Sequence, residues 1–143
     1  MGRHAEAQGA LREVIKRLES LLQKEPERLN EAMSLARAYC SLGASIRDAG
    51  QPAEALPWFA KGQSPLGQAL AKEPQDAKAR LYLRNIHQER AVALEQLKRP
   101  AEADADWAKA IEFSSDHEQK KVQAKQAEWK AKRPPASPKE PAP

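Results

Sequence analysis

The sequence predicts an all-α protein in which antiparallel helix pairs repeat along the chain as an α-solenoid. Helix-favouring Ala, Leu, Glu, Lys, Gln and Arg dominate the composition, and aromatic residues make up only 5%. Apolar residues recur at three- and four-residue spacing, as on one face of a helix. When the sequence is shifted by 48 residues, Leu66 falls on Leu18 and Leu70 on Leu22. The same shift places residues 72–74 on 24–26, and residues 100–103 on 52–55. A fixed period of this kind is typical of stacked repeats, which usually bind other proteins.

About five helices are predicted. The first covers 5–24, with an apolar face made by Leu11, Val14, Ile15, Leu18 and Leu22. It ends at Glu25–Pro26, because a proline disfavours helical geometry in the residue before it. The second covers 27–49 and ends at Gly50, since glycine suits the left-handed conformation that follows many helices. Its apolar face consists of Leu35, Tyr39, Leu42 and Ile46.

The third helix is predicted over 53–73, with Ala55, Phe59, Gly62, Leu66 and Ala69 on its buried face. Pro57 and Pro65 lie inside this helix. A proline removes a backbone hydrogen bond, so we expect Pro65 to kink or break the helix near Ser64.

The fourth helix is predicted over 75–98. Arg90 stands where the previous copy has Leu42, so either its head reaches water or it pairs with Asp104 or Asp106 of the next helix. The fifth helix begins at Ala101, and Ala103, Trp107 and Ala110 repeat the earlier Ala–Phe–Gly triad. The repeat pattern fails after 114, and we expect this helix to continue as a polar, basic extension over 115–132.

Net charge lies in the C-terminal part of the chain. Residues 1–116 carry 17 Lys and Arg against 17 Asp and Glu, whereas 117–143 carry 7 against 3. The proline-rich segment 133–143 is predicted to be disordered. No segment has the apolar core of a signal peptide or the length of a membrane span. A single cysteine, Cys40, is compatible with a reducing compartment, and we expect a cytoplasmic protein.

The helix pairs resemble the tetratricopeptide repeat (TPR). Tyr39, Leu42, Gly43 and Ile46 match the pattern of its first helix, and Ala55, Phe59 and Gly62 that of its second. The repeat domain covers 5–114: an orphan helix 5–24, a unit 27–73 and a unit 75–114. The period exceeds the usual 34 residues by 14, which is about seven residues on each helix. This long-helix form, with residues 35–39, 42–43 and 50–55, looks like the arrays appended to bacterial serine/threonine protein kinases.

The resemblance implies a partner-binding groove on the first helices of the units. Its positions are Arg37, Cys40, Ala44, Arg47, Asn85, Gln88, Val92 and Glu95. Arg37 and Arg47 are suited to an acidic peptide, although both are equally explained as solvated charges. A second candidate surface is the basic extension, formed by Lys120, Lys121, Lys125, Trp129, Lys130, Lys132 and Arg133. Lysine side chains next to an aromatic ring can bind single-stranded nucleic acid or an anionic surface. Trp129 is equally suited to cover the exposed flank of the last repeat as a cap.

Catalysis is not expected, because no histidine pair has metal-ligand spacing and kinase signatures are absent. We therefore predict a non-enzymatic protein-interaction module without cofactors. The alternatives are a regulatory C-terminal segment of a serine/threonine kinase and a nucleic-acid or anionic-surface binder acting through 117–133. Since the first predicted helix lacks a partner helix before it, we expect either a fragment of a longer array or self-association through this helix.

Overall fold

The computed structural model describes residues 2–135, and this part of the chain consists of six helices joined by short turns. The helices are α1 (Gly2–Lys24), α2 (Leu29–Asp48), α3 (Pro52–Lys72), α4 (Ala77–Gln96), α5 (Pro100–Glu112) and α6 (Asp116–Ala131). The prediction of an all-α protein is confirmed for the described residues. Of the segment predicted to be disordered, 136–143 lie outside the described residues.

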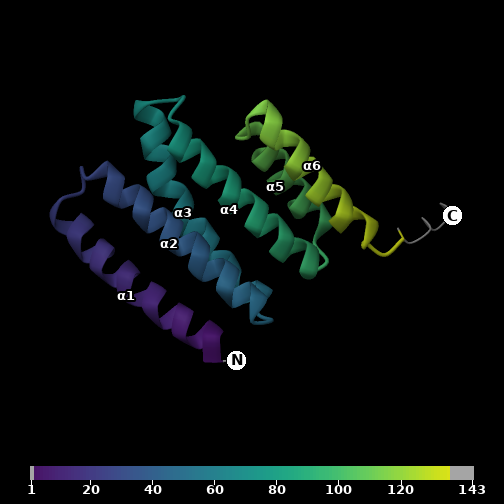
Figure 1. Cartoon of the computed structure of the whole chain (residues 1–143), viewed down its shortest axis with the longest axis horizontal. Helices are drawn as coiled ribbons and strands as arrows, with labels where there is room; N and C mark the ends of the chain where they lie inside the picture. The colour runs from purple at the N-terminus through teal and green to yellow at the C-terminus, as the bar shows by residue number, and fades with distance from the viewer. Residues whose placement is uncertain (1, 136–143) are drawn as a thin grey trace, which may run out of the picture.

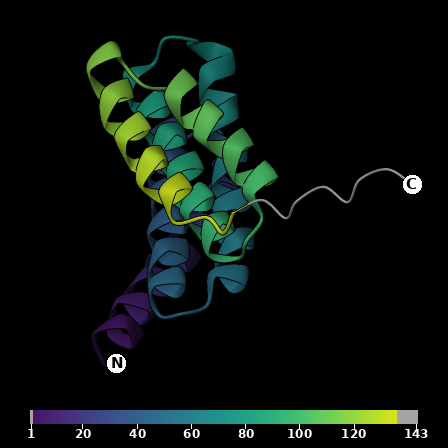
Figure 2. The same ribbon diagram turned by 90° about the vertical axis from the view of Figure 1, so that its right-hand side faces the viewer.

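The helices form two layers. In Figure 1, α2, α4 and α6 lie side by side and run in the same direction, with α3 and α5 behind them. Each helix packs against the next one in the chain, and α2 also contacts α4, which in turn contacts α6. Seen from the side, α6 and α5 form the end of the two layers (Figure 2). The first helix, α1, packs mainly against α2, and the guanidinium of Arg12 also lies 5.3 Å from the centre of the Trp58 ring on α3.

The buried core follows the predicted apolar faces closely. Leu42, Phe59 and Trp107 are fully buried, together with Ala55, Ala103 and Ala110. A close approach between α2 and α3 occurs at Gly43, where an added Cβ would lie 2.7 Å from Cε1 of Phe59. The small residue therefore lets the aromatic ring fill the space between the two helices.

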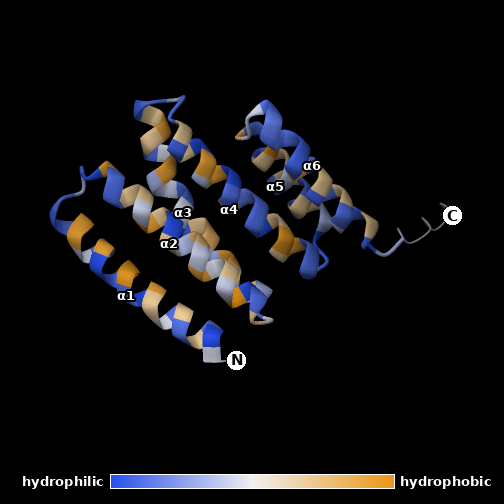
Figure 3. Cartoon of the chain, in the orientation of Figure 1, coloured by the Kyte–Doolittle hydropathy of each residue, from blue (hydrophilic) through white to orange (hydrophobic). Residues whose placement is uncertain are grey.

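Most of the first predicted apolar face is only partly buried. Of its five residues Ile15 is buried, whereas Leu11, Leu18 and Leu22 are half-buried. The side chain of Val14 is 46% exposed, whereas Ile15 on the same helix is 5% exposed. Hydrophobic and hydrophilic turns alternate along α1 in Figure 3. Because the backbone of α1 packs closely against α2 and no other helix, only part of its apolar face is covered.

Pro65 was expected to kink or break the third helix, and the expectation of a break is wrong. The helix α3 runs without interruption from Pro52 to Lys72, with Pro57 and Pro65 inside it. Leu66 and Ala69, which follow Pro65, are both buried in the main core. Tertiary packing of this last part of the helix offsets the backbone hydrogen bond that proline cannot make.

The prediction that the fifth helix continues without a break from Ala101 over 115–132 is also wrong. The helix α5 ends at Glu112 and α6 begins at Asp116. The backbone N–H of Ser115 donates to Oε2 of Glu118 (3.1 Å), as in a capping box, and starts a new helix. The Ser–x–x–Glu spacing of this box was the sequence signal that could have revealed the break.

Candidate functional site

The candidate site is the surface formed by α2, α4 and α6, which we call the inner face. It contains three hollows (the first, middle and end hollows), with volumes of about 130, 290 and 430 Å³. The first lies between α2 and α4 and is lined by Ala36, Arg37, Cys40, Ser41, Tyr82 and Asn85. The middle one lies between α4 and α6 and is lined by Arg84, Gln88, Glu118, Lys121, Val122 and Lys125.

The predicted groove positions divide into two groups. Arg37, Cys40 and Asn85 meet in the first hollow, and Gln88 lies in the middle one. Ala44 is half-buried. Val92, in contrast, is buried in the core between the helices. Glu95 is buried at the floor of the end hollow, where Trp107 and Arg133 hold its carboxylate.

Arg47 holds two helices together. Its guanidinium donates to the carboxylate of Glu89 on α4 and, at 3.1 Å, to the carbonyl oxygen of the same residue. A third contact reaches Asp48 at 2.9 Å. Although burial would lower the pKa of Arg47, these carboxylates raise it. Arg47 is therefore engaged between α2 and α4, whereas Arg37 is exposed on the inner face.

Cys40 lies at the inner edge of the core. Burial, and to a lesser degree the charge of Glu89, raises the pKa of the Cys40 thiol to about 12. A thiol with this pKa is almost entirely protonated at neutral pH and is a poor nucleophile. The arrangement favours a packing role for Cys40.

A buried charged cluster lies between α4 and α5. Arg90 donates to both oxygens of Asp106, at 2.7 and 2.8 Å, and Nδ1 of His87 lies 2.8 Å from Oδ1 of the same carboxylate. Arg90 was expected either to reach water or to pair with Asp104 or Asp106. In the structure it pairs with Asp106. Burial alone would raise the pKa of Asp106, but the hydrogen bonds from His87 and Arg90 lower it. All three groups are mutually satisfied, which indicates a structural cluster.

The basic extension is placed against α4 and α5 as α6. Val122 is buried, and Trp129 packs on the same hydrophobic cluster as Trp107. Lys121 and Lys125 line the middle hollow, whereas Lys120 is exposed. Lys130 lies 3.9 Å from Asp104 at the surface.

Sequence reasoning missed the group that fixes α6. The side chain of Glu95 is 2% exposed and accepts hydrogen bonds from Nε1 of Trp107 (3.1 Å) and Nε of Arg133 (2.9 Å). Arg133 also donates to Asp104 at 2.8 Å. Hydrogen bonds to Glu95 and then to Asp104 raise the pKa of Arg133. The sequence carries no signal for this contact, because the partners lie 29 and 38 residues apart.

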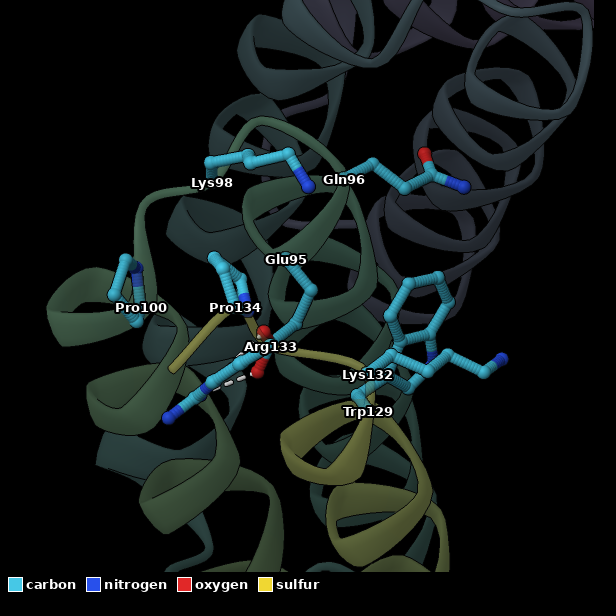
Figure 4. Close-up of a pocket in the computed structure, with 8 residues that line it drawn as sticks. All are labelled: Glu95, Gln96, Lys98, Pro100, Trp129, Lys132, Arg133 and Pro134. Carbon is cyan, nitrogen blue, oxygen red and sulfur yellow. Dashed lines mark hydrogen bonds and ion pairs between the residues drawn. The ribbon is translucent and has the colours of Figure 1, made fainter. Parts of the chain in front are cut away.

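Glu95 and Arg133 also form the floor of the end hollow (Figure 4). Its other lining residues are Gln96, Lys98, Pro100, Trp129, Lys132 and Pro134. The ammonium of Lys132 lies 4.7 Å from the centre of the Trp129 ring. The hollow thus combines apolar walls with two lysines at its margin.

Comparison of the chain with protein-family models, curated proteins and solved structures finds no match. Among the helices of residues 2–135, none is long and apolar enough to cross a membrane. The described residues contain no group of three His, Cys, Asp or Glu side chains placed to hold a metal ion.

Proposed function

We propose that this chain is a non-catalytic protein-interaction module that binds an acidic peptide segment across the inner face. The observation that carries the proposal is that two hollows of this face are lined by cationic side chains without a carboxylate partner. Within residues 2–135, no carboxylate oxygen lies within 4.0 Å of the charged groups of Arg37, Lys121 or Lys125. Cations that no internal carboxylate neutralises favour an anionic partner.

The packing supports the TPR resemblance. The pairs α2–α3 and α4–α5 are each antiparallel, and the first helices of the two pairs lie side by side (Figure 1). The third helix of this layer, α6, begins 39 residues after the start of α4, and the ion pair between Arg84 and Glu118 (2.5 Å) joins the two helices. In a repeat array, such a layer of first helices lines an extended binding surface.

A protein partner is favoured over nucleic acid. Proteins that bind single strands stack successive bases on several aromatic side chains. The extension offers a single tryptophan, Trp129, which packs partly on the cluster under α6 and lines the end hollow beside Lys132. Arg133, another member of the predicted basic surface, is held by Glu95 and Asp104. Only part of the extension is therefore free to meet an anion.

The test is fluorescence anisotropy with a labelled glutamate-rich peptide and a labelled single-stranded DNA of equal length and charge. We expect the full chain to bind the peptide more tightly than the DNA. The triple variant Arg37→Gln/Lys121→Gln/Lys125→Gln should bind the peptide about tenfold more weakly, at roughly 0.5 kcal/mol for each exposed charge.

The matched control is Lys16→Gln/Lys24→Gln/Lys72→Gln, which removes the same charge from exposed sites on α1 and α3. It should lose no more than a small, salt-sensitive part of the affinity. Equal losses in both triple variants would mean that net charge alone attracts the peptide. Preferential binding of the DNA, lost in the first triple variant, would favour the nucleic-acid alternative.

A further inference from the structure

The end hollow lies on the same α4–α6 seam as the middle hollow. Gln88 and Lys125 line the middle one, and Gln96 and Trp129 line the end one, one to two helical turns further along the same two helices. A peptide that follows this seam across the inner face would therefore reach the end hollow.

The walls of the end hollow suit a flat apolar group. The ring of Trp129 stands on one side, and Pro100 and Pro134 contribute on the other (Figure 4). The volume of about 430 Å³ is within the range of cavities that hold small ligands, roughly 300–1,000 Å³. Aromatic rings pack favourably against tryptophan and proline surfaces of this kind.

The margin of the end hollow suits an anion. Lys98 and Lys132 have no carboxylate oxygen within 4.0 Å in the part of the chain that the structure describes. The carboxylate of Glu95 on the floor is already neutralised by Arg133. Two cations without a carboxylate partner thus stand beside an apolar hollow, and this arrangement favours a ligand with negative charge next to an apolar group.

The backbone of Lys98 gives a second, independent indication. Its φ angle is +59°, and no other non-glycine residue in 2–135 has a positive φ. The equivalent residue of the preceding unit, 48 positions earlier, is Gly50 with φ +92°. Both residues end their helix in the same way. The backbone N–H groups of residues 98 and 99, like those of residues 50 and 51, donate to carbonyl oxygens in the last turn of the helix before them. A lysine thus stands where glycine would be less strained, and the side chain that it adds lines the end hollow.

We propose that the end hollow binds an aromatic side chain of the partner peptide, with carboxylates on either side of it meeting Lys98 and Lys132. The proposal rests on the proposed function, because the same peptide would cross the inner face. The aromatic ring would anchor one end of the peptide, and the acidic residues would fix its register.

The experiment compares two labelled nine-residue peptides by fluorescence anisotropy with the full chain. One has a phenylalanine flanked by two glutamates on each side, and the other has alanine in place of the phenylalanine. We expect about tenfold tighter binding of the phenylalanine peptide, since burial of one aromatic side chain suffices for this difference.

Lys98→Gly is the informative variant because it relieves the positive φ and so does not threaten the fold. It should weaken binding of the phenylalanine peptide about threefold although the protein melts at a higher temperature. Lys72→Gln, an exposed charge on α3, is the matched control and should leave binding unchanged.

The two proposals fail differently. Equal affinities for the two peptides, or unchanged binding by Lys98→Gly, would overturn the aromatic anchor and leave the peptide-binding function standing. Binding of neither peptide would overturn both. Free phenylacetate that binds as tightly as the peptide would assign the hollow to a small aromatic acid and overturn the peptide anchor.

Discussion

The contact between Arg133 and Glu95 should determine whether α6 stays docked. Arg133→Gln removes two charge-assisted hydrogen bonds to Glu95 and leaves that carboxylate with the indole N–H of Trp107 as its remaining donor. The Glu95 side chain is 2% exposed, so water cannot replace the lost donors without movement of α6.

The expected loss follows from this burial. Breaking a buried ion pair costs about 3–5 kcal/mol, because one charge remains uncompensated. The Arg133 side chain is 22% exposed, which places this pair at the lower end of the range. We expect the free energy of unfolding to fall by about 3 kcal/mol and the melting temperature by roughly 10 °C.

The assay is urea and thermal unfolding followed by circular dichroism, together with amide hydrogen exchange. Exchange should accelerate most in α6 and at the C-terminal end of α4, since these segments meet at Glu95. Adding Glu95→Gln to Arg133→Gln should restore part of the stability, because a neutral amide replaces the unpaired carboxylate.

Lys130→Gln is the matched control. Its ammonium lies 3.9 Å from Asp104, and both side chains are about half exposed, so we expect a loss below about 0.5 kcal/mol. If Arg133→Gln were no more destabilising than Lys130→Gln, the argument that this contact fixes α6 would be refuted.

Three further predictions concern the fold. Lys98→Gly should raise the free energy of unfolding by about 1 kcal/mol and Gly50→Ala should lower it by a similar amount in urea titrations, since both residues have positive φ. The hydrogen bonds that lower the pKa of Asp106 in the folded protein stabilise it fully only above the pKa of this carboxyl in the unfolded chain, about 3.9. This stabilisation is lost as the pH falls through the lower pKa of the folded state. Asp106→Asn should therefore show a smaller decrease of melting temperature between about pH 5 and pH 2 than the unchanged protein. Gly43→Ala should lower the free energy of unfolding by about 1–3 kcal/mol, because the new Cβ would lie 2.7 Å from the ring of Phe59. Gly67→Ala, whose Cβ would have no neighbour within 4 Å, should raise it by up to about 1 kcal/mol in the same titrations.

The sequence by itself determined the all-α class and most of the core. The faces that contain Leu42, Phe59 and Trp107 could be predicted, because a buried stripe on a helix requires apolar residues at three- and four-residue spacing. The turns at Pro52 and Pro100 were equally readable, since proline is favoured at the first position of a helix. These features depend on local geometry, which neighbouring residues specify.

Local reasoning failed at two points, for different reasons. The Ser115 cap was present in the sequence and starts a new helix, but the polar run after it suggested an uninterrupted one. Pro65 was expected to kink or break α3, yet the helix continues past it with buried neighbours. There a local preference worth about 3 kcal/mol was too small to settle the outcome against packing.

Only the tertiary structure decided the candidate site. It assigned Arg90 to Asp106, enclosed Glu95 with Arg133, and left Arg37, Lys121 and Lys98 without carboxylate partners among the described residues. Ion pairing between residues far apart in the chain depends on which helix faces lie opposite each other. Helical periodicity fixes the faces of each helix but not their neighbours, so the hollows of the inner face could be located only after the helices were packed.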